Sequence, residues 1–454
     1  MHHFDDLAER TAHACLDYAL ERLRLDPAPL DHPVPFAELD AQAGGAITRD
    51  GRPPEEILKI FTDVLAPACL STDSPRFLAF IPAAPTKASL VFDTVVAASS
   101  MCATSWLEAS GAVYAENQVL RVLADLSGMP PAAGGCFVTG GSAGNLSALF
   151  AARETATTRR GRPAGRWRVA VGETAHSSIL STLRILDCDA LVVPSGNDDR
   201  LTGDGLAAVL AADPDPTSVF AVAATAGTTN AGIVDDLAGI GNVARANALW
   251  FHVDGAYGGA ALFASSARPR FSGVEAADSF VVDPHKWLYA PFDSCALLYR
   301  EPELARAAHA QEASYLEPMR DLIDGDDTWN PSDYAYHLSR RARGLPLWFS
   351  LAVHGTDAYS AAVERVLALA RVAADRVKDA PHVALVAEPE LSVVLFRRPG
   401  WTDDDYQSWS RRLLEEQVAF ALPTRWRGET VGRAVFLNPE TTIDIFDEVL
   451  AAMA

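Results

Sequence analysis

The stretch DSFVVDPHKWLYAPFD (278–293) carries a lysine, Lys286, at the end of an apolar run, next to a proline, a histidine and a tryptophan. An isolated lysine is usually a solvated charge. In a pocket, its amine can instead have a lowered pKa and form a Schiff base with a carbonyl compound. Which of the two applies to Lys286 depends on the other polar residues of the chain.

A second stretch, FHVDGAYGG (251–259), places His252 and Asp254 two residues apart, so that they share one face of a predicted strand. An HxD pair can be half of a metal site, but no further ligands at useful spacing lie nearby, and we predict no metal. An aspartate followed by the small Gly255 and Ala256 also suits another task. It can hold a proton on the nitrogen of a flat ring that lies close to the small residues.

Two more stretches could border the same site. In TGGSAGNLSAL (139–149), glycines and Ser142 lie between a strand and a helix, where free N–H groups and the helix dipole favour a phosphate. The stretch is neither a Walker loop nor a GxGxxG motif, and a tight turn alone would also explain its glycines. In ETAHSSI (173–179), His176 is either a core histidine or an imidazole that stacks on a planar cofactor.

The surrounding sequence predicts an α/β protein. Helices are expected over 5–24 and 53–70, joined by a Pro-rich connector (26–39). From about residue 135, short apolar strands alternate with helices, which is typical of a mainly parallel sheet covered on both faces. We expect an N-terminal helical segment (1–75), a large domain (76–345) and a smaller C-terminal α+β domain (346–454).

Composition narrows the possible partners and the compartment. The 454 residues carry a net charge of −21, which argues against nucleic acid or an anionic membrane as the main partner. The six cysteines are far apart and form no CxxC pair, so we expect reduced thiols rather than disulfides or a zinc site. The N-terminal stretch does not resemble a signal peptide, and no segment reaches the length of a membrane span. We therefore expect a cytoplasmic protein.

Taken together, a phosphate cradle, a stacking histidine, a ring-nitrogen carboxylate and a lysine follow one another in the order expected for pyridoxal 5′-phosphate (PLP). TGGSAGN, AHSS, HVDGAYGG and DPHKW resemble the motifs of the group II PLP-dependent decarboxylases, the family of aromatic-L-amino-acid, glutamate and histidine decarboxylases. The resemblance runs from about residue 50 to the C-terminus. It implies the fold of type I PLP-dependent transferases and a homodimer with active sites at the subunit interface, in which the N-terminal segment wraps the partner.

The resemblance also implies residue roles. Lys286 resembles the lysine that holds the cofactor as an imine, and Asp254 the partner of the pyridine nitrogen. His176 and Ala256 match the residues on the two faces of the ring. Tyr315, in a segment expected to be a mobile loop (309–334), matches the tyrosine that protonates the substrate carbon after CO2 has left. Further cofactor-binding positions that match are Ser142, Ala143, Gly144, Thr225 and His285, with serine in many relatives where Gly144 stands.

Substrate preference is indicated by fewer residues. Trp287 resembles the aromatic branch of the family, and Phe80, Ile81 and Pro82 match a wall of the substrate pocket. Thr104 stands where the partner subunit would contribute a phenylalanine, and Ser339 where plant relatives use serine for phenolic substrates.

We expect decarboxylation of an L-amino acid, preferably aromatic, to an amine and CO2. The alternatives are an aldehyde synthase, a decarboxylase of an aliphatic or acidic amino acid, a metal-dependent hydrolase built on His252 and Asp254, and a cofactor-binding scaffold without turnover.

Overall fold

The computed structural model describes residues 2–81, 84–196, 198–311 and 329–454. Within these ranges the large sheet has seven strands in the order β1-β7-β6-β5-β4-β2-β3. Strand β7 runs antiparallel to β1 and β6, and the other neighbouring pairs are parallel. The strands are β1 Gly134–Val138, β2 Arg168–Gly172, β3 Asp189–Val193, β4 Val219–Thr225, β5 Trp250–Asp254, β6 Ser279–Val282 and β7 Cys295–Tyr299. This confirms the mainly parallel sheet predicted from the apolar strand runs.

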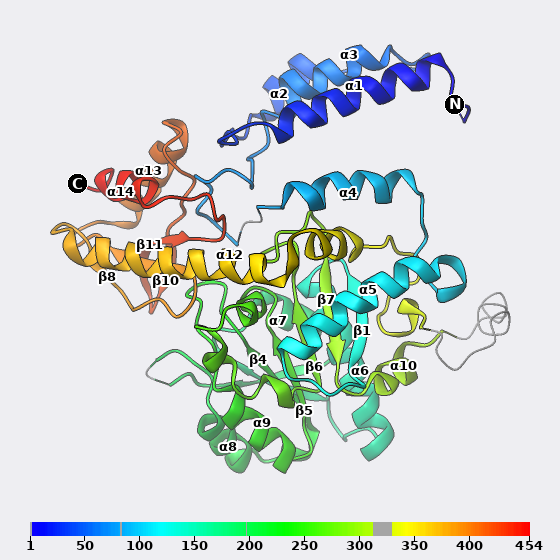
Figure 1. The fold of residues 1–454 in the computed structure, drawn as a ribbon. Coiled ribbons are helices and arrows are strands. Elements are labelled where there is room, and N and C mark those ends of the chain that lie inside the picture. The colour runs from blue at the N-terminus through cyan, green and yellow to red at the C-terminus, as the bar shows by residue number, and fades with distance from the viewer. Residues whose placement is uncertain (1, 82–83, 197, 312–328) are drawn as a thin grey trace.

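Helices cover both faces of this sheet (Figure 1). Alternate strand residues point to opposite faces, and two separate apolar clusters form there. One cluster includes residues of α6 Gly141–Arg160, α7 Ser177–Ile185 and α10 Pro302–His309. The other includes residues of α5 Trp106–Leu126, α8 Gly203–Ala212, α9 Leu237–Ala246 and α12 Leu345–Asp379. Short helical turns complete the domain: η2 Pro216–Ser218, η3 Gly258–Phe263, η4 Arg268–Phe271, η5 Val274–Ala276 and η7 Pro331–Asp333.

The C-terminal region is a smaller α+β unit, as the sequence predicts. Helix α12 is kinked at Gly355, which has a φ of 77°. The small antiparallel sheet that follows has the order β10-β11-β9-β8. Its elements are β8 Ala384–Leu385, β9 Val393–Arg397, α13 Asp403–Glu415, β10 Thr424–Trp426, β11 Glu429–Val435 and α14 Ile443–Ala451. The domain limits at 75 and 345 remain predictions.

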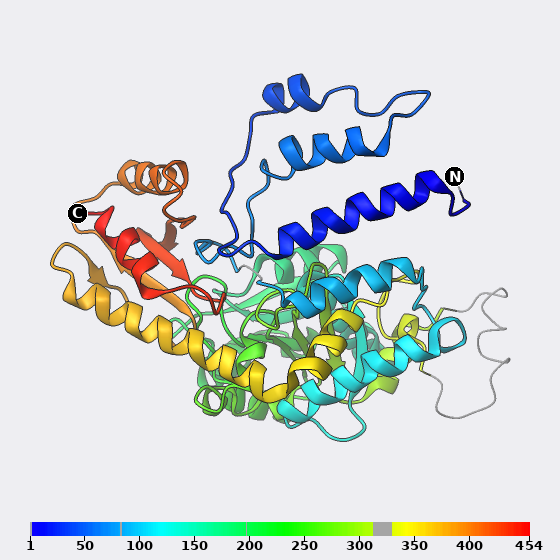
Figure 2. The same ribbon diagram turned by 45° about the horizontal axis from the view of Figure 1, so that its top comes forward.

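The N-terminal helices stand beyond the rest of the chain in both views (Figures 1 and 2). They are α1 Asp6–Leu23, α2 Phe36–Ala43, and α3 Pro54–Ile60 with its π-helical continuation η1 Phe61–Leu65; α4 Lys87–Ala98 follows. The predicted helix over 53–70 therefore ends earlier, and the predicted connector contains the start of α2. Pro35 immediately before Phe36 explains this start, because proline suits the first turn of a helix. None of the residues in α1, α2 or α3 is buried.

Two further expectations bear on the described residues. No helix among them is long and apolar enough to cross a membrane. The six cysteines are all unpaired; Cys136, Cys188 and Cys295 are buried, and burial raises the pKa of Cys136 to about 12.

Candidate active site

A cavity of about 300 Å³ lies where β4, β5 and β6 end and α6 begins. The carboxyl ends of parallel strands are the usual ligand site of such sheets. Seven of the residues singled out in the sequence line this cavity together: Ser142, His176, Thr225, Asp254, Ala256, His285 and Lys286.

Lys286 lies in the turn after β6 and forms an ion pair with Asp283, whose Oδ2 is 2.9 Å from Nζ. Burial lowers the pKa of Lys286, but the charge of Asp283 outweighs it and the pKa is raised. Burial likewise raises the pKa of Asp283, yet Lys286 and His285 hold it below its ordinary value. Asp283 Oδ1 is buried without a hydrogen-bond partner among the described residues. Asp283 was not singled out in the sequence, although it stands in the same DPHKW motif.

Asp254 ends β5 and is 6% exposed. Its Oδ1 accepts a hydrogen bond from the backbone N–H of Ala256 at 3.1 Å, and its Oδ2 accepts one from the Asn145 side-chain amide at 2.8 Å. A carboxylate can accept about four hydrogen bonds, so Asp254 keeps capacity for a donor inside the cavity.

The N-terminus of α6 opens into the cavity through Gly140, Gly141 and Ser142. No side chain caps this helix, so its first N–H groups are free for an anion. A Cβ on Gly141 would lie 2.9 Å from the Cβ of Ala256, so the close approach of the two elements requires glycine here.

Ala143 and Gly144 lie in the first turn of α6, directly after Ser142. Neither is among the residues that line the cavity. Both of their N–H groups donate to the carbonyl of Gly140 inside the helix. A Cβ on Gly144 would lie 2.7 Å from Cγ1 of Val281, so this glycine allows α6 to pack on β6. A serine hydroxyl would not fit there without movement of the strand.

His176 and Ala256 both border the cavity, from different elements. His176 is the N-cap of α7, and its Nδ1 accepts from the backbone N–H of Ser178 at 3.2 Å. The ring is exposed toward the cavity, whereas Ala256 is 8% exposed and follows β5. A small residue and a flat imidazole at one cavity are compatible with a planar ligand between them.

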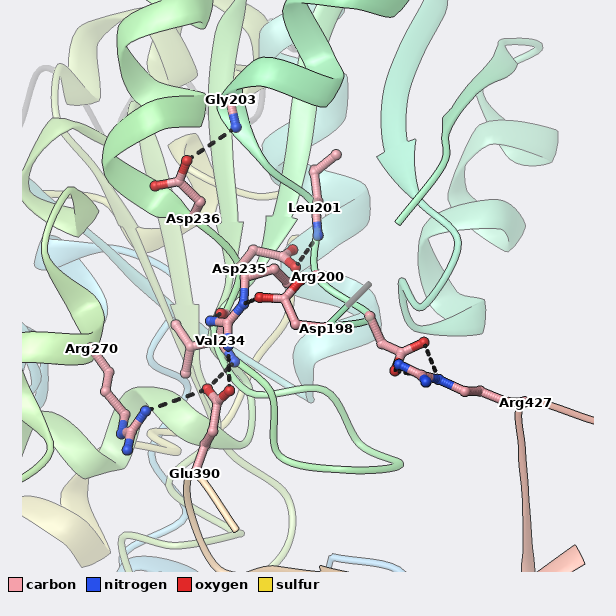
Figure 3. A network of polar contacts seen from close by, with 11 residues as sticks. Asp198, Arg200, Leu201, Gly203, Val234, Asp235, Asp236, Arg270, Glu390 and Arg427 are labelled. Atoms are coloured by element: carbon pink, nitrogen blue, oxygen red, sulfur yellow. Dashed lines mark hydrogen bonds and ion pairs between the residues drawn. The ribbon is translucent and has the colours of Figure 1, made fainter. Parts of the chain in front are cut away.

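Thr225 ends β4, and its backbone N–H is held by the carboxylate of Asp235. The Asp235 carboxylate accepts from the N–H groups of Thr225 at 2.7 Å and of Leu201 at 2.8 Å. Burial raises the pKa of Asp235 to about 7, against the effect of these donors and of Arg200. Figure 3 shows Arg200 beside Asp235 and paired with Glu390 of the C-terminal unit. This network ties one wall of the cavity to the smaller unit.

His252, the candidate metal ligand, has a hydrogen-bonding partner at each ring nitrogen. It is fully buried, its Nδ1 lies 2.8 Å from Ser279 Oγ and its Nε2 lies 2.9 Å from Asn145 Oδ1. Burial lowers its pKa to about 4 although Asp254 is near. No group of three potential metal ligands occurs in the described part of the chain.

The four predicted substrate residues that the structure describes, Phe80, Ile81, Thr104 and Ser339, do not line this cavity. Phe80 is 59% exposed and packs against Phe77 and Phe420, while Ile81 packs against the main apolar cluster. Thr104 is buried beside Cys102, and Ser339 is exposed. Their roles remain predictions, since the cavity described belongs to one subunit. Pro82 and Tyr315 lie outside the described residues.

Arg433 is a neighbouring cation that the sequence analysis did not identify. It is 6% exposed and reaches from β11 toward the cavity wall. Its guanidinium donates to the backbone carbonyls of Phe80, Thr229 and Asn230, and Thr229 lines the cavity. Burial lowers its pKa to about 10. No sequence motif marks this residue, because its position depends on the contact between the two units.

The residues fit PLP. An uncapped helix N-terminus can bind its phosphate, Asp254 has capacity for the ring nitrogen, and Lys286 offers an amine in the same cavity.

Comparison with known proteins agrees with this reading. Residues 40–398 match the model of the pyridoxal-dependent decarboxylase conserved domain. The chain is 28% identical to an aromatic-L-amino-acid decarboxylase of Bacillus atrophaeus over 88% of its length and 84% of the relative's. It is 30% identical to an L-2,4-diaminobutyrate decarboxylase of Rhizobium meliloti (strain 1021), over 93% and 84%.

The fold is similar to the crystal structure of Oryza sativa TDC with PLP and tryptamine. The TM-score is 0.91 at 24% identity, and the match covers 99% of this chain and 98% of that one. The architecture, the cavity and the family match lead to one conclusion: the chain belongs to the family of pyridoxal-dependent decarboxylases and is a carboxy-lyase with PLP as its cofactor.

Proposed function

We propose that this protein removes the α-carboxyl group of an L-amino acid, preferably an aromatic one, and releases the amine and CO2. The observation that carries the proposal is the single cavity in which Lys286, Asp254 and the N-terminus of α6 meet. Tyr257 and Phe292 also line it and offer apolar ring surface to an aromatic side chain.

When bound, PLP takes up the electron pair that remains on the substrate carbon after CO2 leaves. The chain's own residues prepare this step. The N–H groups at the start of α6 would bind the phosphate, and Asp254, which Asn145 Nδ2 holds at 2.8 Å, would keep a proton on the ring nitrogen. Lys286 must lose a proton before it can act as a nucleophile, and in the cofactor-free protein its ion pair with Asp283 Oδ2 at 2.9 Å holds the ammonium form in place.

The positive charge of Arg433 supports an amino acid substrate. Among the described residues no carboxylate is within ion-pair distance of it, and its guanidinium donates to uncharged backbone carbonyls. A buried cation without a counter-ion favours the approach of an anion. The α-carboxylate of a substrate in the cavity beside Thr229 would supply that charge.

A diamino acid is the second candidate substrate. Asp293 lines the cavity with a side chain that is 43% exposed; its Oδ1 pairs with Arg343 at 3.0 Å, and its second oxygen could accept from a cationic substrate side chain. The similarity to an L-2,4-diaminobutyrate decarboxylase favours the same class.

The test is a screen of the PLP-loaded protein with the twenty common amino acids, dihydroxyphenylalanine and 2,4-diaminobutyrate, measuring CO2 and amine. CO2 release from an aromatic amino acid supports the proposal, and preference for the diamino acid supports the second candidate. Absence of CO2 with every substrate would contradict both, provided that borohydride-sensitive visible absorbance shows the cofactor to be bound.

We also propose that two copies form a homodimer with shared active sites, and that it resides in the cytoplasm, as its unpaired cysteines suggest. A groove of about 460 Å³ lies between α1 and α4, lined by Leu16, Leu20, Val91 and Phe292 among others. Leu16 and Val91 are 53% and 47% exposed. Apolar side chains that are exposed together in a groove commonly mark a protein–protein contact. Phe292 borders both this groove and the catalytic cavity.

Val91→Asp is expected to weaken dimerisation at least about tenfold, because it places a charge in the apolar contact. Sedimentation velocity over a range of protein concentrations measures the effect. Val372→Asp is the matched control, since Val372 is 45% exposed on α12 and lies outside the groove. A fully active wild-type monomer would rule out shared active sites.

Tyr315→Phe is expected to shift the products from amine toward aldehyde, ammonia and hydrogen peroxide, with oxygen consumed. The variant keeps the ring but removes the phenolic proton donor that the family resemblance assigns to this position. Amine, aldehyde and peroxide are quantified together for both proteins. If the wild type itself makes mostly aldehyde, the protein is an aldehyde synthase; if the variant makes amine at the wild-type rate, another group supplies the proton.

A further inference from the structure

Asn145 connects Asp254 at the end of β5 with Ser178 and His176 at the start of α7. It lies on the first turns of α6 and is 1% exposed. Its Nδ2 donates to Asp254 Oδ2 at 2.8 Å and to Ser178 Oγ at 3.0 Å, and its Oδ1 is 2.9 Å from His252 Nε2. Both hydrogens and the oxygen of this amide therefore have partners.

The hydrogen bonds of His252 continue through Ser279 to Trp250, and the indole of Trp250 helps to assign their direction. The indole N–H can only donate, and it lies 2.8 Å from Ser279 Oγ. The Ser279 hydroxyl can then donate to His252 Nδ1 at 2.8 Å. The proton of neutral His252 is thus on Nε2 and points to Asn145 Oδ1.

The opposite orientation of the Asn145 amide is unfavourable. It would place the amide oxygen 2.8 Å from the Asp254 carboxylate, with two acceptors facing each other and no proton between them. The low pKa of His252, caused by its burial, agrees with a neutral imidazole that carries one proton. Nearby charged groups are Asp254 on the same strand, and Asp283 and Lys286 in the turn after β6.

The same amide reaches the other side of the cavity through Ser178. Because Ser178 Oγ accepts from Asn145, its own hydrogen is available to His176 Nδ1 at 2.8 Å. The backbone N–H of Ser178 also donates to that nitrogen, so neutral His176 carries its proton on Nε2.

We propose that Asn145 is a positioning residue that holds the carboxylate of Asp254 and, through Ser178, the ring of His176, with His252 as its uncharged support. The hydrogen bonds of Asn145 do not depend on the proposed function. Only their effect on catalysis does, because it requires Asp254 and His176 to border the cofactor. Asn145 has no place in the cavity chemistry itself, and its effect passes through Asp254 and His176.

The first experiment uses 15N-histidine NMR of the cofactor-free full chain and needs no variant. His252 is expected to be neutral with its proton on Nε2 between about pH 5 and 8. A charged His252 at neutral pH, or a proton on Nδ1, would overturn the proposal. This readout involves no substrate, so the proposal can hold even if no decarboxylation is found.

The second experiment replaces the side-chain NH2 group of Asn145 by an oxygen. Asn145→Asp removes the donor to Asp254 and adds a second buried carboxylate, so His252 is expected to become doubly protonated at neutral pH. In the PLP-loaded protein, kcat should fall about 10- to 100-fold with KM nearly unchanged, a magnitude typical of residues that orient a direct ligand. Asn247→Asp is the control, because Asn247 is exposed at the end of α9 and its side-chain amide donates to the backbone carbonyl of Val243, far from the cavity residues. Unchanged His252 spectra, or an equal loss in the control, would refute the assignment.

Discussion

Replacing Lys286 by alanine is expected to abolish decarboxylation and to lower the free energy of unfolding of the cofactor-free protein by about 3 kcal/mol. The activity is lost because the amine that binds the cofactor is lost. The stability falls because Asp283, only 2% exposed, loses the ammonium group 2.9 Å away. Removing one partner of a buried ion pair leaves an uncompensated charge.

The pH dependence identifies the cause of this loss. In the wild type the folded-state pKa of Asp283 is lowered, so its contribution to stability is present at neutral pH and is lost as the pH falls through that pKa. In the variant, the Lys286 ammonium no longer opposes the effect of burial, so the pKa of Asp283 is higher. The free energy of unfolding then falls as the pH rises. We therefore expect a larger deficit at about pH 8 than at about pH 5.

Urea denaturation at both pH values measures the deficit, and a CO2 assay measures the activity. The double variant Lys286→Ala/Asp283→Ala should recover much of the stability without activity. Lys59→Ala is the matched control, since Lys59 pairs with Asp63 on the exposed face of α3 and η1. Decarboxylation by Lys286→Ala at nearly the wild-type rate would contradict the mechanism.

Asp254→Asn is expected to reduce kcat about a thousandfold or more. A neutral amide no longer stabilises a protonated ring nitrogen, and losing even one preorganised electrostatic contact commonly costs about 10² to 10³. Asparagine also has a single side-chain acceptor, so it cannot serve both Asn145 and the Ala256 N–H as Asp254 does. PLP should still bind through Lys286 and the N-terminus of α6, which visible absorbance would show.

A matched control exists on the adjoining strand. Asp278 is partly buried, accepts from the Phe251 N–H at 2.7 Å and precedes β6 at the opposite end of the sheet. Asp278→Asn should affect stability but leave kcat nearly unchanged. An Asp254→Asn enzyme with wild-type turnover would mean that the ring nitrogen has another partner.

The sheet and much of the cavity could be predicted from the sequence because both depend on local patterns. The apolar strand runs predicted the parallel sheet, and polar residues at strand ends, such as Thr225 and Asp254, meet at one edge by topology alone. The motif around Lys286 likewise placed His285 and the lysine in the same cavity.

The residues that escaped prediction depend on distant contacts. Asn145 follows the glycine turn and could have been an ordinary helix residue; its role appears only when β5 and α7 lie beside α6. Gly144 was assigned to the phosphate turn, yet its place is set by its distance to Val281 across the sheet. Arg433 requires the C-terminal unit to be docked before it can reach Thr229.

Phe292 borders both the catalytic cavity and the apolar groove between α1 and α4. If two copies associate through this groove, as proposed above, a ligand that favours one placement of the Phe292 ring would change self-association by the same factor by which self-association changes ligand affinity. Mass action would then make specific activity depend on total protein concentration, with dilution lowering turnover per chain and saturating substrate opposing that loss.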